Sequence, residues 1–223
     1  MKIKYLREVD VVASHLKTEC KQFLEESRCV LYLLSELVDK KVQCDFKKIG
    51  IKIWPKDSVP KSSGNSFIVD SQSSVLILDI GYDIDNYNKL TKLVDRNIEL
   101  VRIIKSTVRL IDKSINFDTE EFFSILESIE RKGFIFEKEH GVWKHNKSKS
   151  ASIKLYTKYD YSGIEFGVKV RNSNNEYEKV FANYGPFEAS TLYELGRVDF
   201  RDNENAIYMP KGFYEPINFN LKR

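Results

Sequence analysis

Three aspartates follow one another at the end of an apolar run. Asp79 comes directly after the run VLIL at 75–78, and Asp83 and Asp85 follow within the stretch LILDIGYDID. Carboxylates at the end of a buried strand can hold a divalent cation against a phosphate group. This pattern gives one functional hypothesis, a metal-dependent phosphodiesterase or nuclease that uses these three residues. The simpler interpretation is that Asp83 or Asp85 caps the helix that follows and interacts with its positive end.

Two further sets of residues contain catalytic residue types, but their spacing does not favour catalysis. His140 and His145 bracket a predicted hairpin next to Lys144, and histidine exchanges protons near neutral pH. One histidine falls in the turn and the other on a strand, so the two rings need not converge. Glu165 and Lys169 lie four residues apart on one predicted strand, an arrangement that cross-strand ion pairs explain. Since the sequence also has no nucleotide-binding or hydrolase motif, it favours binding over catalysis and predicts no cofactor.

Positive charge is concentrated between Arg131 and Arg171. This segment holds ten basic and four acidic residues, a net charge of +6, whereas the whole chain has a net charge of +3. Lysines that line one face of a sheet can release counterions from a nucleic acid, whose bases stack on nearby rings. The same surface can steer an acidic protein to the sheet. The predicted binding surface consists of Lys144, Lys147, Lys149, Lys154, Lys158, Trp143 and Tyr156.

Composition limits the class of protein. An apolar fraction of 42% and an aromatic fraction of 13% are typical of a folded chain. The sequence contains no apolar run of about 18 residues, so we expect a soluble, cytoplasmic protein without membrane contact. Lysine makes up 26 of the 36 basic residues, which suggests an AT-rich genome of a bacterium or a phage. Three cysteines without metal-ligand spacing, Cys20, Cys29 and Cys44, are expected to be reduced core thiols.

Helical periodicity predicts three helices, at 7–40, 86–113 and 119–132. In the first, apolar residues recur every seven positions at Val9, Leu16, Phe23, Val30 and Leu37. We expect this helix to pack on the chain's own core, and its pairing with a second copy, giving a homo-oligomer, is the alternative. The third has an N-cap at Asp118 and a left-handed C-terminal residue at Gly133.

Alternating apolar residues predict strands in the rest of the chain. One runs from residue 46 to 54, and the run at 75–78 suggests a strand buried on both faces. A Pro- and Ser-rich loop is predicted at 55–66. After residue 133 the predicted strands are 134–139, 142–146, 151–158, 163–171, 177–183, 191–200 and 205–209, with turns at 140–141 and 172–175.

Together these elements predict an α+β fold in which long amphipathic helices pack on a mostly antiparallel sheet with a C-terminal β-meander. We expect a single compact unit over 1–223, with a possible subdivision into 1–115 and 116–223. The predicted function is non-catalytic binding of a protein partner through the basic, aromatic-bearing surface, as in an inhibitor, immunity or adaptor protein. A nucleic-acid binder that uses the same lysines and the metal-dependent enzyme above are the alternatives.

Overall fold

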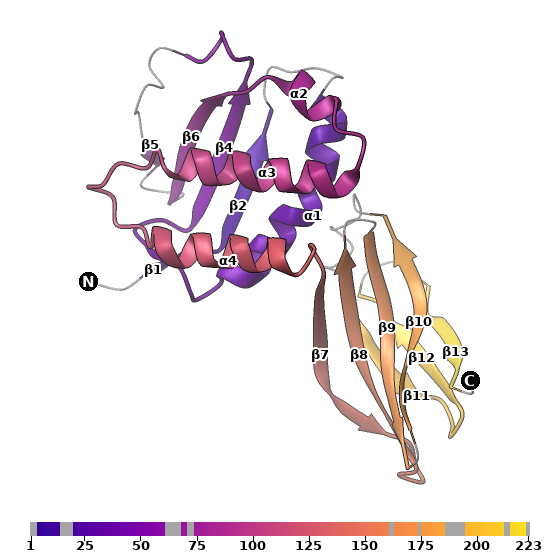
Figure 1. The fold of residues 1–223 in the computed structure, drawn as a ribbon. Helices are drawn as coiled ribbons and strands as arrows, with labels where there is room; N and C mark the ends of the chain where they lie inside the picture. The colour runs from indigo at the N-terminus through magenta and orange to yellow at the C-terminus, as the bar shows by residue number, and fades with distance from the viewer. Residues whose placement is uncertain are drawn as a thin grey trace. The chain divides into compact units, whose positions relative to one another are not determined.

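The computed structural model combines helices and strands and is of the predicted α+β class (Figure 1). Contacts group the chain into two compact units, Met1–Phe134 and Ile135–Arg223. The expected single compact unit, or a division near residue 115, stays a prediction. The structure describes residues 4–13, 20–60, 68–70, 74–160, 163–173, 175–185, 195–211 and 215–221.

The sheet of the first unit is mostly parallel. Its strands are ordered β2 (Glu8–Val12), β4 (Lys48–Trp54), β6 (Val75–Gly81) and β5 (Ile68–Asp70). The first three are parallel and β5 is antiparallel to β6. A separate pair joins β1 (Lys4–Tyr5) to β3 (Gln43–Cys44). Along β6 buried and half-buried residues alternate, so the expectation of a strand fully buried on both faces is wrong.

The described part of the first unit contains four helices beside this sheet: α1 (Lys21–Val38), α2 (Ile84–Asn88), α3 (Leu93–Val108) and α4 (Thr119–Arg131). Helix α1 contacts β2, α3 contacts β6, and α4 packs on both α1 and α3 (Figure 1). Phe23 and Val30 are fully buried, which confirms that α1 packs on the chain's own core. The three cysteines are buried and form no disulfide among the described residues, and burial raises the pKa of the Cys44 thiol to about 11.

The prediction of one helix over 7–40 is wrong, because Glu8–Val12 forms strand β2. Its burial alternates, with Val9 and Val11 inside and Glu8 outside, and each residue pairs with β4 from Lys48 onwards. This pairing partner lies some 40 residues away in the sequence, so a local seven-residue repeat could not reveal it. Leu16 lies outside the described residues. The predicted helix over 86–113 is likewise shorter, since α3 spans only Leu93–Val108.

Helix α4 follows its local signals closely. The Asp118 carboxylate accepts a hydrogen bond from the Glu121 amide at 3.0 Å, which confirms the predicted N-cap. In a capping box the Glu121 side chain would in turn accept a hydrogen bond from the Asp118 amide. Here the Asp118 amide donates instead to the Gln43 carbonyl, at 2.9 Å. Gly133 has φ +61°, the left-handed conformation expected at the C-terminus. No helix among the described residues has the length and apolar character needed to cross a bilayer.

A buried polar cluster joins α1 to the segment that contains α2 and α3. The Glu26 side chain, 8% exposed, accepts hydrogen bonds from Tyr87 Oη at 2.8 Å and from Arg96 Nη1 at 2.7 Å. Arg96 Nε also donates to the Leu90 carbonyl at 2.7 Å, in the link between α2 and α3. Burial raises the pKa of Tyr87, and the hydrogen bond to Glu26 raises it further. The cluster therefore holds three helices through one carboxylate.

The residues of the second unit that the structure describes form two stacked antiparallel sheets. The larger has the order β10 (Glu176–Tyr184), β9 (Gly163–Asn172), β8 (Ala151–Asp160) and β7 (Phe136–His145). The smaller has the order β11 (Arg197–Phe200), β12 (Asn205–Met209) and β13 (Ile217–Asn220). The two sheets lie face to face (Figure 1). Aromatic rings pack between them: Phe181 lies on Tyr208, with ring centroids 4.8 Å apart, and on Phe219 at 5.2 Å. The face of β7–β10 that points away from β11–β13 is called the outer face below.

The predicted turn at His140–Gly141 is wrong, since β7 continues through it as one strand. The register with β8 shifts between His140 and Lys144, which marks a β-bulge. Gly141 takes φ +69° within this bulge, a conformation that glycine adopts at little cost. A glycine next to a polar residue is compatible with both a turn and a bulge, so composition alone did not separate them.

Candidate functional site

The outer face is an ordered array of opposite charges. Its side chains come from alternate positions of the four strands. Its charged members are Glu137, Glu139, Lys154, Lys158, Asp160, Glu165, Lys169, Arg171, Glu176 and Glu178. These are four basic and six acidic groups, a net charge of −2. The prediction that lysines gather on one side of the sheet while acids lie elsewhere is therefore wrong.

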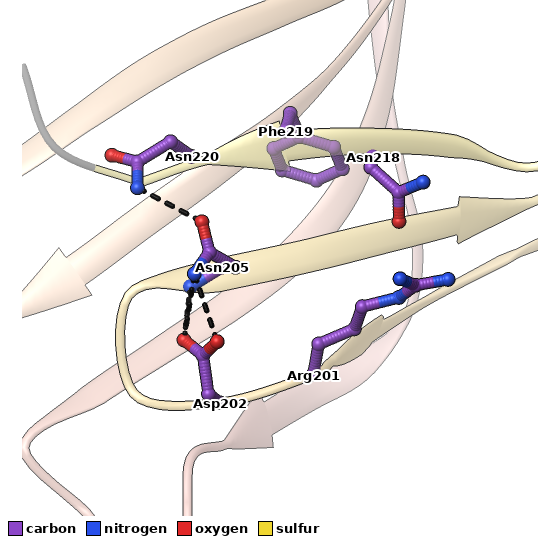
Figure 2. A pocket seen from close by; sticks show the side chains of 6 residues that line it. All are labelled: Arg201, Asp202, Asn205, Asn218, Phe219 and Asn220. Atoms are coloured by element: carbon purple, nitrogen blue, oxygen red, sulfur yellow. Dashed lines mark hydrogen bonds between the residues drawn. The ribbon is translucent and has the colours of Figure 1, made fainter.

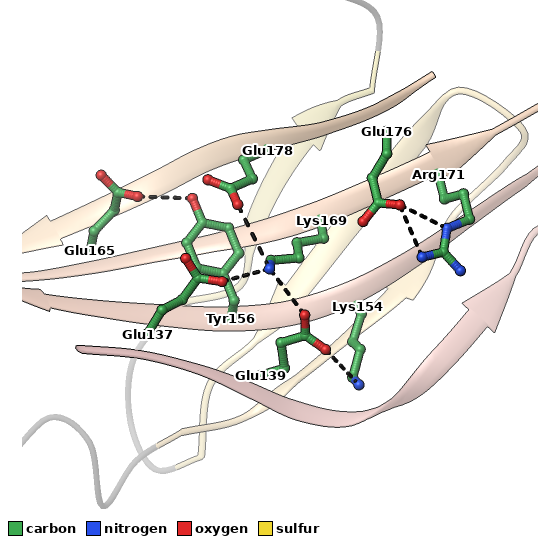
Figure 3. Close-up of polar contacts among 9 residues, drawn as sticks. All are labelled: Glu137, Glu139, Lys154, Tyr156, Glu165, Lys169, Arg171, Glu176 and Glu178. Atoms are coloured by element: carbon green, nitrogen blue, oxygen red, sulfur yellow. Dashed lines mark hydrogen bonds and ion pairs between the residues drawn. The ribbon is translucent and has the colours of Figure 1, made fainter. Parts of the chain in front are cut away.

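Lys169 lies at the centre of this array (Figure 3). Its Nζ lies 2.5 Å from Glu137 Oε1, 3.0 Å from Glu139 Oε1 and 3.8 Å from Glu178 Oε1. Hydrogen bonds to Glu137 and Glu139 raise the pKa of Lys169. Lys154 also binds Glu139, at 2.8 Å, and the hydrogen bonds from Lys154 and Lys169 lower the pKa of Glu139. Lys154 and Lys169 are thus neutralised within the sheet.

Tyr156 is covered by this network and is fully buried. Its hydroxyl donates to Glu165 Oε1 at 2.8 Å (Figure 3). Burial raises the pKa of Tyr156, and the hydrogen bond to Glu165 adds to the rise. The ring lies over Gly167 of the neighbouring strand, where a Cβ would come within 2.6 Å of ring atoms. The predicted role of Tyr156 as an exposed contact residue is wrong, because its ring is packed into the sheet surface.

Replacing Gly167 by alanine should destabilise the second unit by about 1–2 kcal/mol, because the new methyl group must displace the Tyr156 ring. Chemical denaturation of the full chain measures this effect. Gly50→Ala is the matched control: it too is a strand glycine, but a Cβ there would meet its nearest neighbour at 3.9 Å. Equal stability of the Gly167→Ala variant and the wild type would show that the Tyr156 ring packs equally well when residue 167 has a Cβ.

Two of the predicted lysines project from the β7–β8 turn. Lys147 and Lys149 are exposed, and within the described part of the chain neither forms an ion pair. The turn is fixed by Asn146, which is 3% exposed. Its side chain accepts from the Ala151 amide at 3.2 Å and donates to Ser150 Oγ at 3.1 Å, and its carbonyl accepts from the Lys149 amide at 3.0 Å. The ammonium groups of Lys147 and Lys149 therefore project from a turn whose conformation is fixed by hydrogen bonds.

An aromatic–cation pair lies beside this turn. The Arg171 guanidinium lies 4.4 Å from the centroid of the Trp143 ring, within the range of a cation–π contact. Arg171 also pairs with Glu176 at 2.9 Å. Val142, in the β7 bulge, is 77% exposed. We call this group the hairpin patch; it consists of Val142, Trp143, His145, Lys147, Lys149 and Arg171.

The remaining predicted surface residues lie elsewhere. Lys144 pairs with Asp199 of β11 at 2.9 Å and so joins the two sheets; this interaction lowers the pKa of Asp199. Lys158 is half-buried and lies in register between Glu137 and Glu165. Of the seven predicted residues, the structure brings together Trp143, Lys147 and Lys149 as an accessible group.

The residues considered for catalysis do not converge. His140 lies opposite Leu155, on the face towards the second sheet, and its Nε2 is 2.7 Å from Thr157 Oγ1. His145 lies on the outer face, opposite Ser152. Lys169 takes part in the cross-strand ion pairs described above, which confirms the simpler interpretation of that residue.

Two of the three aspartates of the metal hypothesis, Asp79 and Asp83, have separate local partners for their carboxylates. Asp79 Oδ1 accepts from the Trp54 indole at 2.6 Å. Asp83 Oδ1 accepts from the Asp85 amide at 3.1 Å and is the N-cap of α2, which confirms the capping interpretation. Among the described residues no three potential ligands form a metal-binding group.

A shallow depression of about 360 Å³ lies at the β11–β12 turn, lined by Arg201, Asp202, Asn205, Asn218, Phe219 and Asn220 (Figure 2). Asp202 accepts two hydrogen bonds from the Asn205 side chain, and Asn205 Oδ1 accepts from Asn220 Nδ2 at 2.9 Å. Asp202 also accepts from the amides of Glu204 and Asn205 at 2.8 Å. These groups close the turn and the sheet end, so much of their hydrogen-bonding capacity is used internally.

The fold and the site define a two-unit α+β protein with a charged sheet face and an accessible basic hairpin. No family model, no curated protein and no solved structure matches this chain.

Proposed function

We propose that this chain is a non-catalytic binding protein, of the inhibitor, immunity or adaptor type, that docks a protein partner through the outer face. The observation that carries the proposal is the hairpin patch, where Lys147 and Lys149 stand exposed on a hydrogen-bonded turn. Beside them, Trp143 and Val142 offer apolar area, and aromatic and basic groups dominate the energetics of many interfaces. We further propose that the protein works in the cytoplasm of a bacterium or a phage host.

Charge on the outer face favours a protein over a nucleic acid as the partner. Lys154 and Lys169 are already paired with glutamates, so they are poorly placed to neutralise phosphates and release the counterions that a nucleic acid carries. The glutamates Glu137, Glu139 and Glu178 would also repel phosphates along the face. A protein surface can instead match both signs of charge. The antiparallel strands of the proposed β-meander would hold the positive and negative charges of the outer face in fixed positions.

Affinity capture from a native host lysate tests the proposal. We expect the wild-type chain to retain a protein that Lys147→Glu/Lys149→Glu loses, because charge reversal turns attraction into repulsion at the centre of the patch. The matched control is Lys56→Glu/Lys113→Glu, which reverses two exposed lysines of the first unit and should retain the same protein.

Labelled single-stranded RNA and duplex DNA serve as competing ligands in the same assay. Binding of either one at low salt, lost in Lys147→Glu/Lys149→Glu but not in the control, would contradict the protein-docking proposal and support the nucleic-acid alternative. If the wild type, Lys147→Glu/Lys149→Glu and the control variant all capture the same amount of the protein, the docking site lies outside the hairpin patch.

A further inference from the structure

The depression at the β11–β12 turn lies on the smaller sheet and shares no residue with the outer face or the hairpin patch. Its volume of about 360 Å³ suits a small molecule. Five of its six lining residues carry planar polar groups, namely one guanidinium, one carboxylate and three amides (Figure 2). Since Arg201 and Asp202 carry opposite charges, the lining has no net charge. The depression therefore has the size and polarity of a site for a small, polar, neutral molecule.

Part of this lining is fixed by its own hydrogen bonds. The Asp202 carboxylate accepts four of them, two from the Asn205 side chain and two from main-chain amides. The Asn205 side-chain oxygen accepts another from Asn220 Nδ2. A carboxylate has about four lone-pair sites, so the hydrogen bonds within the turn use the accepting capacity of Asp202. These three side chains shape the depression and leave the binding of a ligand to the other polar groups.

Arg201 and Asn218 supply that binding capacity. Both are exposed, and neither side chain forms a hydrogen bond or an ion pair within the part of the chain that the structure describes. In Figure 2 the Asn218 amide points across β12 towards the end of the Arg201 side chain. The guanidinium group offers N–H donors only, whereas the Asn218 amide offers donors and an acceptor. A ligand that satisfies both groups must accept several hydrogen bonds and donate at least one.

Hydroxyl groups meet both requirements, because each one accepts and donates a hydrogen bond. Neighbouring hydroxyls of a sugar ring could bind the two side chains at once. A carboxylate or a phosphate accepts only, so it would leave the Asn218 side-chain oxygen without a donor and would lie near the charge of Asp202. A metal cation would be repelled by Arg201 and would find the Asp202 oxygens occupied. The lining therefore favours a neutral, hydroxyl-rich molecule.

We propose that this depression is a saccharide-binding site, in which Arg201 and Asn218 bind the hydroxyl groups of a neutral sugar. Asp202 and Asn205 keep the site in shape. The inference goes beyond the proposed function and does not depend on it, because the site lies on β11–β13 rather than on the outer face. An open site buries only part of its ligand, so we expect weak, millimolar affinity.

NMR titration of the isotope-labelled full chain with glucose, galactose, mannose and N-acetylglucosamine tests the inference. Each sugar is added up to about 50 mM, which detects millimolar affinity. At least one sugar should shift the amide resonances of the β11–β12 turn and of β13, while those of the first unit stay unchanged. The dissociation constant should be the same at about 0.05 M and about 0.5 M salt, because the ligand carries no charge to be screened. Inorganic phosphate and acetate are the competing probes.

Two variants assign the binding groups. Arg201→Ala/Asn218→Ala should raise the dissociation constant of the bound sugar at least tenfold, because it removes the hydrogen bonds of both side chains. The matched control Arg7→Ala/Asn88→Ala removes an exposed arginine and an exposed asparagine of the first unit and should leave the constant unchanged. Arg201→Gln keeps a hydrogen-bonding amide without the charge and should weaken sugar binding less than Arg201→Ala does. Circular dichroism and a cooperative melt confirm that each variant is folded.

The absence of amide shifts at this turn with all four sugars would overturn the inference. Larger shifts with phosphate or acetate, lost in Arg201→Gln, would identify an anion site instead and reject the saccharide. Equal sugar affinity of the wild type and Arg201→Ala/Asn218→Ala would also overturn it, because the sugar would then bind elsewhere. None of these results bears on the proposed function, which capture through the hairpin patch tests separately.

Discussion

Glu26→Ala should lower the free energy of unfolding of the first unit by about 3–5 kcal/mol, the usual range when one partner of a buried ion pair is removed. The Arg96 side chain, 14% exposed, would keep its charge in the protein interior without the carboxylate that neutralises it. The Tyr87 hydroxyl would lose its acceptor as well. Since the pair joins α1 to α3, the loss should affect the whole unit rather than one helix end.

Urea denaturation followed by far-ultraviolet circular dichroism measures this loss. Glu25→Ala is the matched control, because Glu25 is the neighbouring residue on α1 and forms only a 3.8 Å ion pair with the exposed Lys21. Its effect should lie within about 0.5 kcal/mol of zero. A Glu26 variant no less stable than the Glu25 variant would show that the buried cluster does not hold the helices together.

Lys169→Met should lower the free energy of unfolding of the second unit by about 2–3 kcal/mol at neutral pH, as expected for charge-assisted hydrogen bonds. The Lys169 side chain is 17% exposed and holds three glutamates. Without it, Glu137, Glu139 and Glu178 would face one another as like charges. Lys158→Met, the same change on the same face, is the control and should cost less, since Lys158 is not at the centre of the network.

The effect of Lys169→Met should shrink in acid. The pKa of Glu139 is lowered in the folded state, by hydrogen bonds from Lys154 and Lys169. A carboxyl group of this kind stabilises the fold above its unfolded-state pKa, and the stabilisation is lost as the pH falls through the folded-state pKa. Denaturation at several pH values between 7 and about 3 should therefore bring the wild type and the variant closer together. A constant difference across this range would contradict the role assigned to Lys169.

Sequence patterns revealed local structure better than long-range pairing. The N-cap at Asp118, the left-handed Gly133 and the helix between them depend on residues close in sequence, and each is found where predicted. Strand β2 was missed because its partner β4 is distant along the chain. The alternation that begins YEKVF at 177–181 predicts the strand found as β10, but nothing local shows which neighbours its side chains meet.

The candidate site illustrates the same limit. Counting charge along Arg131–Arg171 gave a basic segment, yet strand pairing brings Glu176 and Glu178 of β10 onto the same face. Alternation also places Glu137 and Glu139 there rather than on the opposite side. The EKE pattern at 137–139 could have signalled an acidic face, because it puts both glutamates on one side of a strand and Lys138 on the other.

Amine labelling of the chain in its partner-bound state, compared with the same chain in the free state, tests the central claim most directly. The account predicts that Lys147 and Lys149 become protected on binding while Lys56 and Lys113 of the first unit react at unchanged rates. Unchanged labelling of Lys147 and Lys149 together with protection of lysines in the first unit would contradict it.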